Sequence, residues 1–265
     1  MARLPAFGFF AAGMILCGAA NAACGVSAER GPRVIRAAYS PDAEAAPGVA
    51  ITFLGHASFE IESPGHVTAV TDYNGVNIPA DPPDIATMNH AHSTHYTLDP
   101  DPRIGHVLHG WRDDGGPARI DLTLGDLHVR NLPTNIRDWA GGGTEQYGNS
   151  IFVFEAAGLC MAHLGHLHHL LTPDDLATLG QLDVVMTPVD GMWTLSLDDM
   201  MTVIESLHAP LVIPMHYYDR SHLRRFLARV GGQYPVRENP TATVRITRAA
   251  LPPSTEILVV PGPPG

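Results

Sequence analysis

Three short apolar runs in this chain lead directly into histidines, and this arrangement limits what the chain can fold into. The runs cover residues 85–88, 159–163 and 211–214. Apolar runs of four to eight residues bounded by turn residues are typical of buried β-strands. Because the ends of adjacent strands meet at one edge of a sheet, histidines at three strand ends can converge on one metal ion. The sequence therefore predicts a β-rich fold with a metal site at a sheet edge.

Six histidines at these strand ends are the predicted metal ligands. They are His90, His92, His95, His163, His166 and His216. Imidazole is the commonest side-chain ligand for zinc and related ions. We expect a divalent metal, one or two ions per chain, with zinc as the leading candidate. Histidine ligation alone does not choose among zinc, iron, manganese and copper.

The other histidines have a more ordinary interpretation. An isolated histidine is more often an exposed or hydrogen-bonded residue than a ligand, and we assign that role to seven of them. These are His56, His66, His106, His109, His128, His208 and His222. We also expect His168 and His169, beside the second cluster, not to bind metal.

The remaining pattern indicates an α/β fold. Further strand-like runs occupy residues 49–54, 58–62, 67–71, 119–124, 127–132, 150–155 and 182–186. Helix-start signals stand at Thr172, Ser196 and Asp219. Strands that come first, followed by strand–helix units, predict two packed mixed β-sheets with helices outside. We expect one such domain at residues 49–265.

The N-terminal segment is typical of an exported protein. Residues 1–22 combine Arg3, a short apolar centre and a small-residue ending, which together describe a secretory signal peptide. The apolar run is too short to span a bilayer. Residues 23–48 form a lead-in segment. The alternative to release of the protein after cleavage of the signal peptide is lipid attachment at Cys24. In the periplasm or outside the cell, Cys24 and Cys160 can form a disulfide.

Charge and missing motifs exclude several function classes. The formal net charge of −11 argues against a nucleic-acid partner, which needs a basic face. The sequence contains no GxSxG elbow, P-loop or dinucleotide fingerprint. A small-molecule substrate is the partner that we expect, and the sequence predicts no stable membrane span and no particular oligomeric state.

The first histidine cluster resembles the motif of a known family. Residues 90–95, His-Ala-His-Ser-Thr-His, resemble the HxHxDH loop of the metallo-β-lactamase superfamily. Residues 51–59 resemble the opening strand and turn of its ascorbate-6-phosphate lactonase-like branch, residues 163–166 its HxGD-like motif, and residues 213–216 its final histidine. The resemblance spans about residues 49–219. It implies an αββα sandwich with the metal site at one edge of the two sheets.

The resemblance also implies roles for individual residues. His90, His92 and His163 would hold a first ion, and His95 and His216 would belong to a second. Asp72 would lie beneath the site and orient a histidine ring. Asp190 is a further candidate carboxylate near the site, although a turn role before glycine is at least as well supported.

Two residues depart from the family pattern. Thr94 stands where the loop has aspartate, and His166 stands where the family has its bridging aspartate. Without these carboxylates, two dications about 4 Å apart repel by several kcal/mol even at an effective dielectric near 20. Either His166 acts as a ligand in an all-histidine site with one or two metals, or only the first site binds an ion, which then keeps one coordination position open.

The expected function is that of a metal-dependent hydrolase. A metal-bound hydroxide would attack an ester, lactone or phosphodiester, with Asp72, Thr94 and Asp190 as the candidate catalytic side chains. The alternative is a non-catalytic exported metal- or ligand-binding protein on the same fold. We expect the glycines at 141–143 to form a loop bordering the site. Four aromatic residues are candidates either for a substrate pocket or for the core: Trp111, Trp139, Trp193 and Tyr217.

Overall fold

The computed structural model describes residues 47–138 and 141–262. The predicted signal peptide at 1–22, Cys24 and Trp139 therefore lie outside the described residues. The first strand begins at Val49, where the sequence pattern predicts the start of the domain. Cys160 is disulfide-bonded, but Cys24, its predicted partner, lies outside the described part of the chain.

The described residues form fourteen β-strands and three α-helices. One group of strands comprises β1 (Val49–Gly55), β2 (Ser58–Glu62), β3 (Thr68–Val70), β4 (Ile85–Met88), β5 (His106–His109) and β13 (Thr243–Ile246). The other comprises β6 (Asp121–Leu124), β7 (Leu127–Asp138), β8 (Gly143–Ala156), β9 (Leu159–His163), β10 (Val184–Pro188), β11 (Leu211–Met215), β12 (Val236–Glu238) and β14 (Glu256–Val259). The helices are α1 (Pro173–Leu179), α2 (Leu197–Leu207) and α3 (Arg220–Val230), with a short 3-10 helix at Arg248–Ala250.

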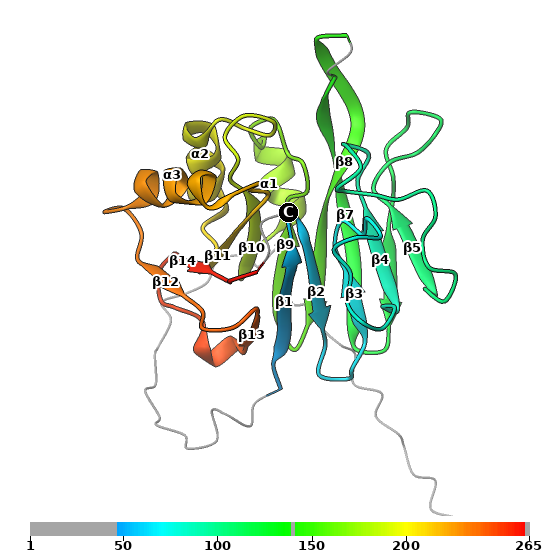
Figure 1. The fold of residues 1–265 in the computed structure, drawn as a ribbon, viewed down its shortest axis with the longest axis horizontal. Helices are drawn as coiled ribbons and strands as arrows, with labels where there is room; N and C mark the ends of the chain where they lie inside the picture. Colours follow the sequence, from blue (N-terminus) through cyan, green and yellow to red (C-terminus); the bar gives the residue numbers. More distant parts are fainter. Residues whose placement is uncertain (1–46, 139–140, 263–265) are drawn as a thin grey trace, which may run out of the picture.

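The strands form two mixed sheets that pack against each other (Figure 1). The six-stranded sheet has the order β13-β1-β2-β3-β4-β5, and the eight-stranded sheet has the order β12-β14-β11-β10-β9-β8-β7-β6. Strands β3, β4 and β5 are mutually parallel, as are β9, β10 and β11, whereas β1–β2 and β7–β8 are antiparallel pairs. The predicted sandwich of two mixed sheets is confirmed.

A continuous apolar core holds the two sheets together. Phe59 from β2 and both Phe152 and Phe154 from β8 are fully buried in one hydrophobic cluster. Phe53 and Phe59 stack with their ring centroids 4.9 Å apart. Complete burial of such a side chain contributes roughly 1.5–3 kcal/mol to folding. This rigid core fixes the strand ends from which the histidine loops leave.

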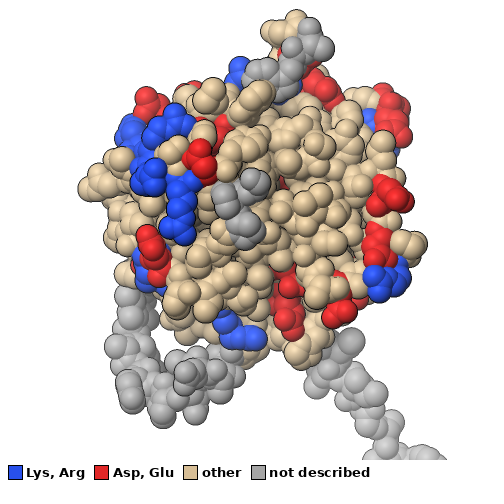
Figure 2. All heavy atoms as spheres, in the orientation of Figure 1, with Lys and Arg blue, Asp and Glu red and all other residues tan. Residues whose placement is uncertain are grey.

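The three helices follow β9, β10 and β11 and start at the residues that the sequence predicts. The side chains of Thr172 and Ser196 accept hydrogen bonds from the backbone N–H groups of Asp175 and Asp199, and Asp219 caps α3 in the same way. Helix α2 buries one apolar face, which includes Met200 and Ile204. The four arginines of α3 are exposed and form the blue patch at the upper left of Figure 2, as expected for a solvated face.

The structure differs from the sequence pattern mainly in its polar strands. Strands β7 and β8 extend well beyond residues 127–132 and 150–155 and form the long hairpin at the top of Figure 1. The glycines at 141–143 lead into β8 rather than forming a separate loop, and Gly142 N–H donates to the carbonyl of Asp138 over 3.0 Å. Strands β5, β12, β13 and β14 were also not predicted. Strands β12 and β13 are largely exposed and lack the apolar run on which the prediction depends, whereas β14 is short but buried.

Within the described residues, no helix combines the length and the apolar character needed to cross a membrane.

Candidate metal centre

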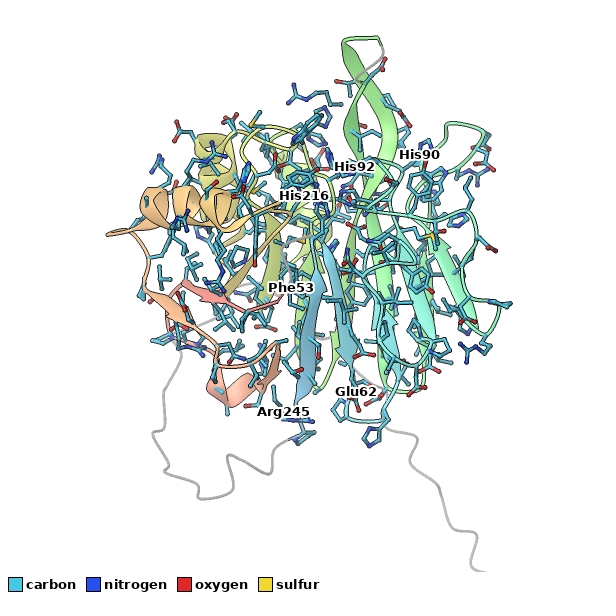
Figure 3. The ribbon with its side chains drawn as sticks, in the orientation of Figure 1. Phe53, Glu62, His90, His92, His216 and Arg245 are labelled. Carbon is cyan, nitrogen blue, oxygen red and sulfur yellow. The ribbon has the colours of Figure 1, made fainter. Side chains whose placement is uncertain are left out.

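The loops that follow five parallel strands meet at one edge of the sandwich. Asp72 follows β3, and His92 and His95 follow β4 in the six-stranded sheet. His166 follows β9, Asp190 follows β10, and His216 follows β11 in the eight-stranded sheet. Figure 3 shows His92 and His216 side by side at this edge, far from Glu62 and Arg245 at the opposite end of the strands. Parallel pairing in both sheets therefore brings distant histidines together.

Four of these histidines form a compact group. Each of His92, His95, His166 and His216 offers one ring nitrogen, and the four nitrogens lie within 4.8 Å of one another. The six centroid distances between their rings range from 4.5 to 5.5 Å. His95, His166 and His216 are buried, whereas His92 is partly exposed. Solvent thus reaches the group from the His92 side.

This geometry fits a metal ion. Imidazole nitrogens bind zinc at about 2.0–2.1 Å, and tetrahedral ligation at that length puts ring centroids about 5 Å apart. Among the described residues, Nε2 of His92 and both ring nitrogens of His166 are buried with no hydrogen-bond partner. Leaving such polar atoms unpaired costs about 1–3 kcal/mol each. A cation bound to these nitrogens would offset that cost.

Two of the rings are hydrogen-bonded through Nδ1, and Nδ1 of a third makes no hydrogen bond but lies at ion-pair distance from a carboxylate. Nδ1 of His92 lies 2.9 Å from the Thr94 hydroxyl, and Nδ1 of His95 lies 2.5 Å from Oδ2 of Asp72. Nδ1 of His216 lies 3.1 Å from Oδ1 of Asp190. A partner at Nδ1 leaves Nε2 free to bind metal and fixes the direction of the ring. Nε2 of His95 and Nε2 of His216 are accordingly 3.0 Å apart, facing each other.

Each of the three predicted catalytic side chains contacts a histidine of the group. Asp72 is fully buried and also accepts a hydrogen bond from the Asn89 amide at 3.0 Å, so it supports both His95 and the start of the loop. Asp190 accepts from the Thr194 hydroxyl and from the backbone N–H of Met192, which anchors the loop after β10. Thr94 contacts the ring of His92. Each of these contacts sets the position of a histidine.

Burial lowers the pKa values of three histidines of this group and favours their neutral form. Desolvation, assisted by neighbouring His216, lowers the pKa of His92 to about 4 and holds the pKa values of His95 and His166 well below the usual range. Neutral imidazole is the form that binds metal. Burial opposes ionisation of Asp190, yet neighbouring His216 and a hydrogen bond from Thr194 lower its pKa. Burial raises the pKa of Asp72, and a nearby cation would favour the ionised carboxylate instead.

His56 is a fifth histidine at the site, and sequence reasoning assigned it an ordinary role. Its ring centroid lies 4.3 Å from that of His216 and 5.5 Å from that of His95. The side chain is fully buried, and neither ring nitrogen has a hydrogen-bond partner among the described residues. Its position directly after β1 was the available signal, because the ligand candidates also follow strand ends.

Strained backbone is concentrated at this edge of the molecule. His56, Asp72 and His216 have φ angles of 52°, 44° and 56°, a region that side-chain-bearing residues seldom adopt. The backbone N–H of His216 donates to the carbonyl of His56 over 2.6 Å, which couples two of the three. Such conformations cost on the order of 1–3 kcal/mol each and cluster at functional sites.

His90 lies outside the group, although the HxHxDH resemblance places it in the first metal site with His92. Its backbone N–H donates to the carbonyl of Gly148, and its Nδ1 lies 3.1 Å from Oε1 of Glu145. Its ring stacks on Trp111 with a centroid distance of 5.1 Å. Contacts with β8 thus turn the ring away from His92, and Figure 3 shows the two side chains apart.

His163 also lies outside the group, because its two ring nitrogens have backbone partners. Nε2 donates to the carbonyl of Ala57 over 2.8 Å, and Nδ1 accepts from the N–H of Gly165 at 3.2 Å. The ring is completely buried. His163 therefore ties the end of β9 to the turn between β1 and β2, and this places the loop that carries His166.

Gly165 offers a test of how tightly that loop is held. Its φ is +59°, and an added Cβ would lie 2.3 Å from Oδ1 of Asn149 and 2.5 Å from Nδ2 of Asn89. We expect Gly165→Ala to lower the free energy of unfolding by about 2–4 kcal/mol in urea denaturation. Gly142→Ala is the matched control, since Gly142 has φ +72° but open space around it. Equal effects of the two changes would show that backbone strain alone, without the asparagine contacts, explains the result.

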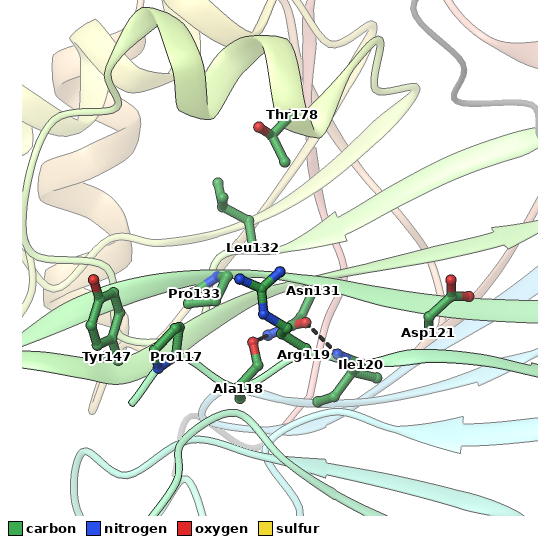
Figure 4. Close-up of a pocket in the computed structure, with 10 residues that line it drawn as sticks. All are labelled: Pro117, Ala118, Arg119, Ile120, Asp121, Asn131, Leu132, Pro133, Tyr147 and Thr178. Carbon is green, nitrogen blue, oxygen red and sulfur yellow. Dashed lines mark hydrogen bonds between the residues drawn. The ribbon is translucent and has the colours of Figure 1, made fainter. Parts of the chain in front are cut away.

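The aromatic residues proposed for a substrate pocket or for the core lie in both environments. Trp193 is 42% exposed, in the loop after β10, whereas Tyr217 is only 3% exposed and packs in the core. Trp111 stacks with both His90 and His109. A separate groove of about 470 Å³ runs beside Asn131 and Thr178 (Figure 4), and its lining residues include none of the histidine group.

Known structures with the same fold support this assignment. A candidate zinc-dependent hydrolase of the metallo-β-lactamase superfamily from Thermotoga maritima is 25% identical, with a TM-score of 0.59, over 81% of this chain and 99% of that chain. A candidate metal-dependent hydrolase from Parabacteroides distasonis is 13% identical, with a TM-score of 0.57, over 80% of this chain and 92% of that chain. The metallo hydrolase Igni18 from Ignicoccus hospitalis is 19% identical, with a TM-score of 0.53, over 75% of this chain and 98% of that chain. The last two show the fold alone. No curated protein is similar enough in sequence to count as a relative.

The fold and its edge of clustered histidines define a protein of the metallo-β-lactamase fold with a candidate metal centre. Residues 50–216 match the family described as the beta-lactamase superfamily domain, and the chain belongs to this family. The ascorbate-6-phosphate lactonase-like branch stays a prediction.

Proposed function

We propose that this protein is a metal-dependent hydrolase whose single ion is held by His92, His95, His166 and His216. The observation that carries the proposal is the group of four ring nitrogens within 4.8 Å, in which His92 and His95 are hydrogen-bonded through Nδ1 and His216 lies beside Asp190. Zinc is the leading candidate for the ion, as for most imidazole-rich sites. The family and the structural neighbours support hydrolysis as the reaction.

Charge favours one ion over two. All four proposed ligands are histidines, which bring no negative charge, and the carboxylates Asp72 and Asp190 contact His95 and His216 from behind. Through the rings that they contact, these two carboxylates can offset the charge of one dication. Among the described residues, no carboxylate bridges two metal positions, so nothing offsets the repulsion between two dications. His166 replaces the family's bridging aspartate, so it supplies a ligand nitrogen without supplying negative charge.

The side chains of the site have two roles: some orient the histidine ligands, and others keep solvent away from the ion. A bound divalent ion would lower the pKa of a coordinated water and polarise a carbonyl or phosphoryl oxygen. Thr94 keeps the ring of His92 oriented at the solvent side, while Asp72 and Asp190 keep His95 and His216 oriented beneath it. Burial of the other three rings excludes bulk water from all sides except that of His92.

The alternative function is metal or ligand binding without catalysis, and one observation favours it. Catalytic zinc sites keep a position open, with three protein ligands, whereas four protein ligands are typical of closed structural sites. His56 adds a fifth imidazole nearby. Hydrolysis then requires that the ion accept a fifth ligand or release one histidine.

The test is hydrolysis by protein that has been stripped with a chelator and reloaded with zinc, iron, manganese or cobalt. The substrates are a nitrophenyl ester, a lactone and a nitrophenyl phosphodiester. The proposal predicts metal-dependent turnover that His95→Ala abolishes. Tight metal binding with no turnover on any substrate would favour the non-catalytic alternative.

Export remains part of the proposal rather than a structural result. The sequence of residues 1–22 supports a periplasmic or secreted location, and these residues lie outside the described part.

A further inference from the structure

Large apolar side chains are exposed around the histidine group. Eight such side chains are exposed in the described part, and seven lie on the loops that carry the site residues. The seven are Val76, Ile78, Leu98, Leu170, Met192, Trp193 and Tyr218. The eighth, Val236, lies on β12. Exposed apolar side chains that gather in one region mark a binding surface rather than ordinary surface variation.

The topology places these side chains around the metal centre. Val76 and Ile78 follow β3, Leu98 follows β4, Met192 and Trp193 follow β10. The ends of these strands meet at the edge where the histidines cluster. Whatever covers these apolar side chains therefore contacts the same loops that carry the histidine group.

A hollow beside the histidine group is lined by part of this apolar rim. It has a volume of about 600 Å³ and is lined by Val76, Tyr96, Leu98 and Thr94, together with neighbouring polar residues. Leu98 is 90% exposed and Val76 is 82% exposed. Thr94 also lies 2.9 Å from Nδ1 of His92. An apolar group bound in the hollow is thus one side chain away from the metal ligands.

The charges of these loops select against anions. The five loops contain seven aspartates and one arginine, Arg103, which pairs with Asp101. Asp72 and Asp190 are buried behind the histidines, and Asp84 accepts a hydrogen bond from the backbone N–H of Thr68 at the opposite end of β3 and β4. Asp81, Asp99, Asp101 and Asp219 remain on the loops of the rim. Arg137 reaches the loop after β10, where it donates to the carbonyl of Thr194 over 3.3 Å. A predominantly acidic rim lowers the local concentration of anionic substrates such as phosphodiesters.

We infer that the substrate is an uncharged ester or lactone that carries an apolar chain, and that the loops after β3 and β4 bind that chain. This inference rests on the proposed hydrolase function and names its substrate class. The chain lies against Val76 and Leu98, and the bond to be hydrolysed lies at the histidine group.

The test compares zinc-loaded protein on nitrophenyl acetate, nitrophenyl decanoate and a nitrophenyl phosphodiester. We expect kcat/KM to be at least about tenfold higher for decanoate than for acetate, the scale of a few apolar contacts, and the phosphodiester to be the poorest substrate. The double variant Val76→Ser/Leu98→Ser should reduce the decanoate preference to about threefold or less. Val236→Ser is the matched control and should change neither rate, because Val236 lies away from the rim.

Failure of the inference and failure of the proposed function give different results. Equal kcat/KM for acetate and decanoate, or a preference for the phosphodiester, would overturn the substrate class while leaving hydrolysis intact. If no ester is hydrolysed, binding of a neutral fluorescent decyl amide decides the inference. Binding that Val76→Ser/Leu98→Ser weakens and Val236→Ser does not would support the apolar site, and no binding would overturn it.

Discussion

Alanine at any one of His92, His95, His166 and His216 is expected to lower the affinity for zinc by at least about a hundredfold. Loss of a residue that only supports a ligand already costs roughly 10–100-fold, and these four are the proposed ligands themselves. Their ring nitrogens lie within 4.8 Å of one another. Competition with a chromophoric chelator measures the change, and circular dichroism verifies that each variant is folded.

His90→Ala is the matched control for this series, because His90 lies two residues from His92 in the same loop. Its ring contacts Glu145 and Trp111 instead of the histidine group. We expect zinc affinity within about threefold of the unchanged protein. A loss as large as that of His92→Ala would mean that the site follows the family's HxHxDH arrangement rather than the geometry described above.

The metal-free protein is expected to lose about 2 kcal/mol of stability between pH 7.5 and pH 5 through His163 alone. Burial lowers the pKa of His163 to about 4, from 6.5 in the unfolded chain, although its hydrogen bond to Ala57 opposes the shift. The unfolded state therefore takes up a proton below pH 6.5, while the folded state stays neutral until about pH 4. Stability is complete above pH 6.5 and falls as the pH is lowered, by up to about 1.4 kcal/mol per unit.

Urea denaturation at several pH values measures this effect. His163→Leu removes the titrating ring, so its free energy of unfolding should depend less steeply on pH than that of the unchanged protein, whatever its stability at pH 7.5. Parallel pH profiles for the two proteins would contradict a buried neutral His163. Zinc should raise the free energy of unfolding of both proteins, since it binds the folded form.

The sequence predicts most of the fold because apolar runs and helix caps are local signals. The strands before the histidine clusters and the helix starts at Thr172, Ser196 and Asp219 are observed where expected. The outer half of β8 was missed because it is polar and exposed at residues 143–146, and the outer half of β7 because its sequence, Pro-Thr-Asn-Ile-Arg-Asp, contains no apolar run. These strands are stabilised by pairing with each other, which no short window of sequence reveals.

The sequence identifies the loops of the candidate site better than the direction of each ring. His92, His95, His166 and His216 were predicted near the metal and lie together. His90 and His163 lie outside the group because of partners far away in the sequence, Glu145 on β8 and the carbonyl of Ala57 in the turn between β1 and β2. His56 joins the site because an unusual backbone conformation after β1 turns its ring toward His216. Such tertiary contacts are not encoded in residue spacing.

X-ray absorption at the zinc edge of the reloaded protein tests the central claim most directly. A single ion held by His92, His95, His166 and His216 predicts about four imidazole nitrogens at about 2.0–2.1 Å and no metal neighbour. A second metal at about 3.5–4 Å, as in two-metal hydrolases, would contradict the single all-histidine centre.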